Sequence, residues 1–209
     1  VVDFGGRVVR EATPGNLGGV EDLIEESSDP SSSLTYSSTQ STTDAVVAAI
    51  IIKDGKVGIA AVQGMTITVC EFEDDPFLTT TETCLVQLAV KEVLVMDGKA
   101  LQVDSEQRKL TSIAHSLNCV ITPLKQSVFD EHNGEADILK MCKNPNDCNL
   151  VQNKPFILGA ISALCGYMNL LSYDAAYHQY TVCEHPIAMF MRLDETALRS
   201  LDLFPKHQH

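Results

Sequence analysis

The sequence is poor in positive charge, and this shortage argues against several classes of protein. Only 15 of its 209 residues are Lys or Arg, against 28 Asp or Glu, so the net charge is −13. Nucleic-acid binding draws most of its affinity from contacts between cations and phosphates. We therefore expect this segment, taken alone, to bind nucleic acid poorly.

Other features that the sequence lacks further narrow the classes of protein to which it can belong. No apolar run approaches the about 20 residues that a membrane span needs, and neither the phosphate-binding pattern G-x-x-x-x-G-K-[ST] nor a C-x-x-C pair occurs. The seven cysteines are scattered, mostly among apolar neighbours, and indicate reduced thiols in an intracellular protein. The first residues include no initiator Met and no signal peptide, so we expect the chain to be cut from a longer protein.

The stretch before residue 45 is polar and of low complexity. No Lys or Arg occurs between residues 11 and 52, and 12 of the 17 residues from 27 to 43 are Ser or Thr. Such a composition cannot bury enough apolar surface to fold by itself. We interpret residues 18–44 as an acidic, Ser/Thr-rich loop, either a plain surface insertion or a phosphorylatable regulatory segment.

Residues 45–73 read as the structural centre of the chain. A continuous apolar run at residues 46–52 is followed by a turn around Asp54 and Gly55, and Asp-Gly favours tight hairpins. Two further strand-like runs follow, which predicts a three-stranded antiparallel meander. Because the first run is apolar on both faces, it should lie inside a sheet with layers on either side.

Later elements extend this sheet. Thr79 and Glu82 have the spacing of a capping box and predict a helix over residues 80–89, followed by strands over residues 90–96 and 119–122. A strand reached through a helix favours a parallel crossover. The order β-β-β-α-β-α-β predicts an α/β protein of ribonuclease H-like fold, with a mixed sheet of antiparallel meander plus parallel crossover strands flanked by helices.

The C-terminal third should supply the other layer. Pro155 suits the first turn of a long helix with a broad apolar stripe, which we expect to be the best-buried helix. The remaining expected elements are a polar helix at residues 128–142, strands at residues 177–183 and 188–193, and a helix at residues 195–204.

A ribonuclease H-like sheet cleaves phosphodiesters only when carboxylates hold two divalent metals. The first carboxylate must come from the interior of the first strand, which here offers only Val, Ala and Ile. Asp97 ends the fourth strand and Glu82 begins the first helix, but two carboxylates without the first do not make a metal site. A metal-dependent nuclease remains the enzymatic alternative.

Other candidate groups are weaker, and we assign no catalytic, cofactor-binding or metal-binding residue. Cys142 and Cys148 lack two further metal ligands, and Cys183 and His185 lie too close in sequence to face each other across a cleft. A cluster of acidic residues after the third strand is either a solvated strand end or a docking surface for a basic partner; its members are Glu71, Glu73, Asp74 and Asp75.

Five stretches, in the correct order, resemble the connector domain of MutS homologues, the mismatch-recognition ATPases. They match the exit from the mismatch-binding domain, two connector strands, a helix-to-strand step and the entry to the lever domain, and lie at residues 13–17, 56–60, 70–74, 86–94 and 190–201. The resemblance is strongest to the eukaryotic member shared by both mismatch-recognition heterodimers.

The resemblance implies a division of the chain. Residues 1–17 would be the tail of the mismatch-binding domain, residues 45–186 a noncatalytic ribonuclease H-like connector, and residues 187–209 the start of the lever domain. The connector would relay conformational change between the mismatch-binding and ATPase regions and offer surface to MutL-type proteins. The mismatch-wedging Phe-x-Glu and the ATPase motifs are absent from this segment.

The same resemblance implies partners and cofactors for the full-length protein. It would be a nuclear, mismatch-dependent ATPase that uses ATP and Mg and forms a heterodimer with a second MutS homologue. It would bind a MutL homologue and mismatched DNA, with little direct DNA contact from this acidic segment and no membrane association. A meiotic-type MutS homologue, with a crossover function instead of repair, is the alternative within the family.

Overall fold

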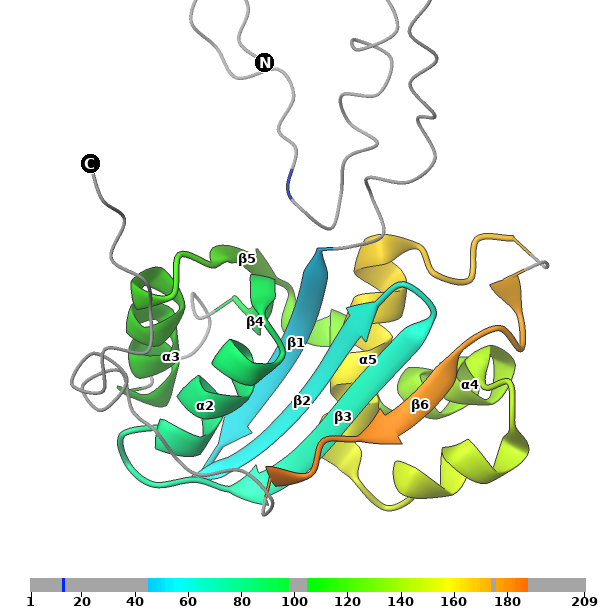
Figure 1. The fold of residues 1–209 in the computed structure, drawn as a ribbon, viewed down its shortest axis with the longest axis horizontal. Helices are drawn as coiled ribbons and strands as arrows, with labels where there is room; N and C mark the ends of the chain where they lie inside the picture. Colours follow the sequence, from blue (N-terminus) through cyan, green and yellow to red (C-terminus); the bar gives the residue numbers. More distant parts are fainter. Residues whose placement is uncertain (1–12, 14–44, 98–104, 174–175, 188–209) are drawn as a thin grey trace, which may run out of the picture.

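A mixed sheet lies between two pairs of helices in the computed structural model, which describes residues 13, 45–97, 105–173 and 176–187. The helices α2 and α3 cover one face, and α4 and α5 cover the other (Figure 1). The six strands lie in the order β5-β4-β1-β2-β3-β6. This three-layer arrangement confirms the predicted fold class, with β1 inside the sheet.

The strands pair as the sequence order predicts. β1 (Val46–Lys53), β2 (Lys56–Gln63) and β3 (Thr66–Glu73) form the antiparallel meander. Parallel strands extend both sides of it: β4 (Val90–Met96) beside β1, β5 (Val120–Leu124) beside β4, and β6 (Thr181–Glu184) beside β3. The crossover strands next to a three-stranded meander give the ribonuclease H-like topology.

The helices are of moderate length. Their bounds are Thr79–Gln87 for α2, Ser105–Ser116 for α3, Glu131–Met141 for α4 and Pro155–Met168 for α5. Two short 3₁₀ helices, η2 (Gln126–Val128) and η3 (Pro145–Leu150), flank α4. Within the described ranges, none of these helices combines the length and apolarity needed to cross a bilayer.

The β1–β2 turn follows from its sequence. Asp54 and Gly55 have φ angles of 53° and 75°, the left-handed conformations that a two-residue hairpin turn requires. The twist of such a turn matches that of the strands, so the register runs without a break from Lys53–Lys56 to Val47–Val62.

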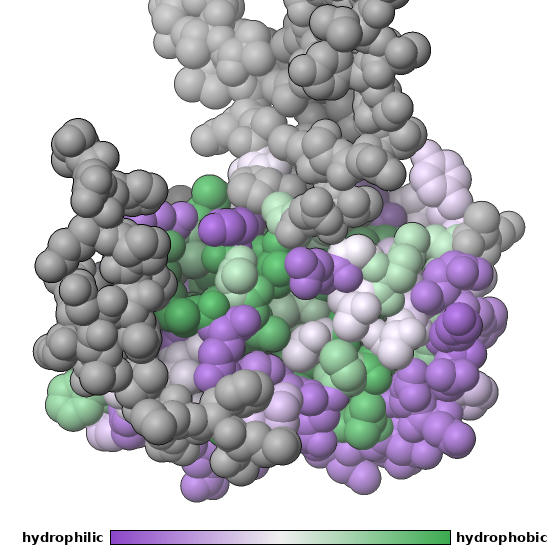
Figure 2. Space-filling view, viewed as in Figure 1, coloured by the Kyte–Doolittle hydropathy of each residue, from purple (hydrophilic) through white to green (hydrophobic). Residues whose placement is uncertain are grey.

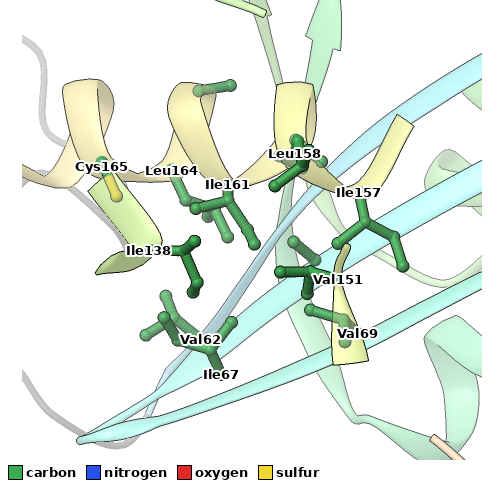
Figure 3. Close-up of a cluster of buried hydrophobic side chains, with 14 of the residues drawn as sticks. Val62, Ile67, Val69, Ile138, Val151, Ile157, Leu158, Ile161, Leu164 and Cys165 are labelled. Atoms are coloured by element: carbon green, nitrogen blue, oxygen red, sulfur yellow. The ribbon is translucent and has the colours of Figure 1, made fainter. Parts of the chain in front are cut away.

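β1 supplies both hydrophobic cores. Val47, Ala49 and Ile51 face α5, whereas the alternate residues face α2 and α3 and are Val46, Ala48 and Ile50. On the α5 side, the apolar side chains of the helix point toward the strands (Figure 3). Every residue of α5 from Ile157 to Cys165 is buried, which confirms the expectation for this helix.

Close packing of α5 depends on glycine. A Cβ atom at Gly58 of β2 would lie 2.4 Å from Cβ of Phe156, and one at Gly134 of α4 would lie 1.9 Å from the carbonyl oxygen of Leu158. The absence of a Cβ at these two positions lets the first half of α5 approach both the sheet and α4. Asn169 ends α5 in a left-handed conformation.

The predicted capping box at Thr79 and Glu82 is wrong. Leu78 occupies the N-cap position and makes no side-chain hydrogen bond, while Thr79 is already helical. The carboxylate of Asp74 replaces the missing cap, since it accepts hydrogen bonds from the backbone N–H groups of Thr80 at 3.0 Å and Thr81 at 2.8 Å. An upstream residue therefore satisfies the exposed donors of the first turn.

The replacement Asp74→Ala should lower the free energy of unfolding by about 1 kcal/mol, the usual cost of losing a capping side chain. Urea titration at pH 7 measures this, with Glu73→Ala as a control that removes the same charge from an exposed neighbour. Equal midpoints for the two variants would contradict the assignment of Asp74 as the cap.

The Asp74 effect should also depend on pH. Burial alone would raise the pKa of Asp74, but hydrogen bonds from the hydroxyl and N–H groups of Thr81 and from the N–H of Thr80 outweigh it and lower the pKa. The carboxylate therefore stabilises the fold fully above the unfolded-state pKa of about 4. As pH falls through the lowered folded-state pKa, the difference between wild type and Asp74→Ala should vanish.

Two other element boundaries differ from the prediction. The polar helix begins at Glu131 instead of residue 128, because the Asp130 side chain accepts the N–H of Asn133 and caps α4 there. The strand expected from residue 177 begins at Thr181, because His178 adopts a φ of 57° and donates its N–H to the carbonyl of Lys140. Outside the described residues lie the Ser/Thr-rich loop and the elements predicted at residues 188–193 and 195–204.

Candidate functional site

A hollow of about 650 Å³ lies at the carboxyl ends of the parallel strands β1 and β4. In open α/β sheets this edge is where ligand sites usually form. Apolar side chains from β1, β4, α5 and the connection between η2 and α4 line it, namely Ile51, Ile52, Met96, Phe129 and Phe156. A nuclease of this fold would need a metal-binding carboxylate from β1 here, and β1 instead contributes isoleucine.

Charged residues form the rim of the hollow. Asp54, Glu106 and Glu131 contribute carboxylates, and Lys53 contributes an ammonium group. The first turns of α3, α4 and α5 also meet here, and the acidic side chains of α3 and α4 offset the partial positive charge of these helix ends. Glu106 also accepts the N–H of Gly55 at 2.9 Å and so braces the β1–β2 turn. An apolar floor with a polar rim is the usual anatomy of a protein-binding surface.

The carboxylates weighed for metal binding lie elsewhere. Glu82 is in the first turn of α2, and Asp97 follows β4, where its N–H donates to the carbonyl of Leu124 at 2.7 Å. Neither is among the residues that line the hollow. In the part of the chain that the structure describes, no three His, Cys, Asp or Glu side chains come together as metal ligands would.

Glu92 is a buried carboxylate that the sequence analysis missed. It lies on β4 with none of its surface exposed, and is the only fully buried acidic side chain among the described residues. The hydroxyl groups of Thr122 on β5 and Tyr167 on α5 each donate to its Oε1 atom at 2.6 Å. Tyr167 is in turn 2.5 Å from the hydroxyl of Thr13, a residue 154 positions away. Hydrogen bonds of this kind are what make a buried carboxylate tolerable.

Alternation along β4 explains why Glu92 points toward α5, since Leu94 and Met96 on the same face pack in the core on the α5 side. In the pairing of β1 with β4, Val46 lies opposite Val90 but Val47 lies opposite Glu92, so the register skips Lys91. This bulge leaves Lys91 exposed to solvent and places Val90 in the core beneath α2 and α3. Strict alternation along residues 90–96 cannot foresee the position of Val90. The available signal for Glu92 was a charged pair, Lys91 and Glu92, in an otherwise apolar run.

The cysteine and histidine candidates have other partners. Burial, together with the neighbouring Cys148, raises the pKa of Cys142 to about 12, so this thiol is poorly suited to bind a metal or act as a nucleophile. Cys183 lies 3.4 Å from the hydroxyl of Thr68, whereas Nε2 of His185 lies 2.8 Å from Oε1 of Gln87. All seven cysteines are free thiols.

The acidic cluster after β3 is partly structural. Asp74 caps α2, and Asp75 accepts the N–H of Phe77 at 2.7 Å. Glu73 is exposed and Glu71 is half-buried. Figure 2 shows that hydrophilic residues also dominate the border of the molecule around α4 and β6. The two aspartates thus have a role in the fold, and the cluster as a whole is a less distinctive surface than the hollow.

Sequence similarity to known proteins extends over nearly the whole chain. A segment of the DNA mismatch repair protein MSH2 of Saccharomyces cerevisiae is 29% identical over 216 residues, covering 99% of this chain. The corresponding segment of Neurospora crassa msh-2 is 29% identical and covers 95% of this chain, and that of Zea mays MSH2 is 26% identical and covers 94%. The chain is MSH2-like. This confirms the resemblance to MutS homologues drawn from the sequence motifs.

The MSH2-like chain is similar to only part of these proteins, since it spans about a fifth of their length: 21% of the yeast and Neurospora proteins and 20% of the maize protein. No protein-family model matches the chain. Among solved structures, the Thermus thermophilus RuvC chain in complex with a Holliday junction has a TM-score of 0.38 and 10% identity, with 65% of this chain and 98% of that chain covered.

Proposed function

We propose that this chain is the connector segment of a MutS homologue acting in DNA mismatch repair. The observation that carries the proposal is the similarity to MSH2 proteins over 94–99% of the chain. The relatives are all named as mismatch repair proteins, which favours repair over a meiotic crossover function. The full-length protein would be nuclear, would hydrolyse ATP with Mg, and would pair with a second MutS homologue.

The role of the segment would be to transmit movement and to present a surface. Two hydrophobic cores on the faces of one sheet support a body that moves as a unit when ATP or mismatched DNA binds elsewhere. The net charge of −13 agrees with little direct DNA contact from this part.

We place the docking surface for a MutL homologue at the hollow beside β1 and β4. Its apolar floor would accept a hydrophobic anchor from the partner, and its rim would contribute polar contacts. Glu131 is exposed on this rim, at the start of α4. The surface therefore has one residue whose charge can be reversed without disturbing a buried contact.

The variant Glu131→Arg in the full-length protein should weaken binding of a MutL homologue by about tenfold or more, because a large side chain of opposite charge would stand at the rim. Binding is measured by surface plasmon resonance in the presence of ATP and mismatched duplex. Glu135→Arg is the matched control: it makes the same exchange one turn along α4, away from this hollow, and should bind within about twofold of wild type.

Different outcomes test the docking position, the docking role and the MutS assignment separately. Normal MutL binding by Glu131→Arg would show that the docking surface is not at this hollow. A wild-type protein that fails to bind any MutL homologue would remove the docking role, and one that does not prefer mismatched to matched duplex would remove the MutS assignment itself.

A further inference from the structure

A chain of hydrogen bonds connects the interior of the sheet to Thr13. It runs from Thr13 through the hydroxyl of Tyr167 to the carboxylate of Glu92. Thr13 is the only described residue before position 45, and it lies in the stretch that the sequence analysis assigned to the tail of a neighbouring domain. The contact thus joins two parts of the chain that are remote in sequence.

The direction of these hydrogen bonds follows from the number of protons that each hydroxyl group can donate. A Tyr hydroxyl has one proton, and Tyr167 gives it to Glu92. The oxygen of Tyr167 therefore accepts, and Thr13 donates to it. Burial and the bond to Glu92 raise the pKa of Tyr167, which keeps its proton in place at neutral pH.

We propose that Tyr167 and Glu92 form a latch that holds the N-terminal segment of this chain to the connector body through Thr13. The hold is coupled to the interior, because a movement of Tyr167 would take a hydrogen-bond donor from a carboxylate with no exposed surface. The hydroxyl group of Thr122 on β5 donates to the same Glu92 oxygen.

The latch is a physical contact through which the proposed relay of conformational change could pass between the N-terminal segment and the connector body. If residues 1–17 belong to the mismatch-binding domain, a pull on that domain acts first on Thr13 and then on α5 and β4. This second role rests on the proposed function, whereas the hold on Thr13 does not. The two are tested by different measurements.

The test is hydrogen–deuterium exchange of the full chain, followed by mass spectrometry on the peptide that contains Thr13. The variant Tyr167→Phe removes only the hydroxyl and should speed exchange in this peptide by about tenfold or more. Tyr173→Phe, the same change at a side chain that is 79% exposed, should leave the exchange rate unchanged.

A second variant separates the latch from general loss of stability. Thr13→Val keeps the shape of the side chain but breaks only the outer bond, so exchange should rise around residue 13 while β4 stays as protected as in wild type. The latch is refuted if the wild-type peptide exchanges as fast as in denaturant, or if both substitutions leave its rate within about twofold. MutL binding, measured separately, would still stand or fall independently.

Discussion

Replacing Ile50 with Asp should unfold the protein. Ile50 is 2% exposed on β1, opposite Ile59 of β2, and faces the apolar cluster beneath α2 and α3. The variant loses a buried side chain and places a carboxylate among hydrocarbon groups, at a combined cost of more than about 5 kcal/mol. Domains of ordinary stability have only about 5–15 kcal/mol to lose. Circular dichroism with urea titration measures the result.

Two control variants show whether the unfolding depends on the buried position of residue 50 or on the carboxylate itself. Lys53→Asp places the same carboxylate at the exposed end of the same strand and should fold normally. Ile50→Val removes one methylene and should cost about 1 kcal/mol. A midpoint for Ile50→Asp that equals wild type would mean that β1 does not lie where the structure places it.

Replacing Gly134 with Ala should lower the free energy of unfolding by about 2 kcal/mol. The new Cβ would stand 1.9 Å from a backbone oxygen of α5, which no change of side-chain conformation can relieve, so α4 and α5 must separate. Overpacking of this kind costs about 3 kcal/mol, and the better helix propensity of Ala returns about 1 kcal/mol. In a chain of this size, calorimetry should show a fall in Tm of about 4–8 °C.

Gly166→Ala is the matched control for this prediction. It makes the same exchange within α5, where the nearest atom to the new Cβ, Cγ1 of Val128, is at an ordinary 3.8 Å. The gain in helix propensity should therefore appear alone, as a slight rise in Tm. If Gly134→Ala also raised Tm, the close crossing of α4 and α5 would be disproved.

Local patterns sufficed to predict most of the sheet. The apolar run of β1 predicts a strand buried on both faces, and Asp54 with Gly55 predicts the hairpin turn that follows it. Each of these signals lies within a few consecutive residues, so it can be recognised without knowledge of tertiary contacts. The crossover strands then follow from connectivity alone, because a helix between two strands favours parallel pairing.

The errors arose where distant residues decide the local structure. Asp74 displaces the expected cap of α2 from several positions upstream. The bulge at Lys91 depends on how β4 meets β1, and the partners of Glu92 come from β5 and α5. Such choices are made by tertiary contacts, which no periodicity within a single segment contains. The hollow likewise joins residues from several remote segments.

The sheet is completed by a strand from far along the chain. β6 covers the outer edge of β3 in parallel, with pairs that run from Thr66–Thr181 to Val69–Glu184, while the other edge of β3 pairs with β2 in the hairpin. Premature termination before Thr181 would therefore leave the edge of β3, a strand rich in β-branched residues, with unpaired amides and carbonyls, a ready template for association with other chains. Shortened products of this protein would be lost to aggregation and degradation even though the meander they contain is intact.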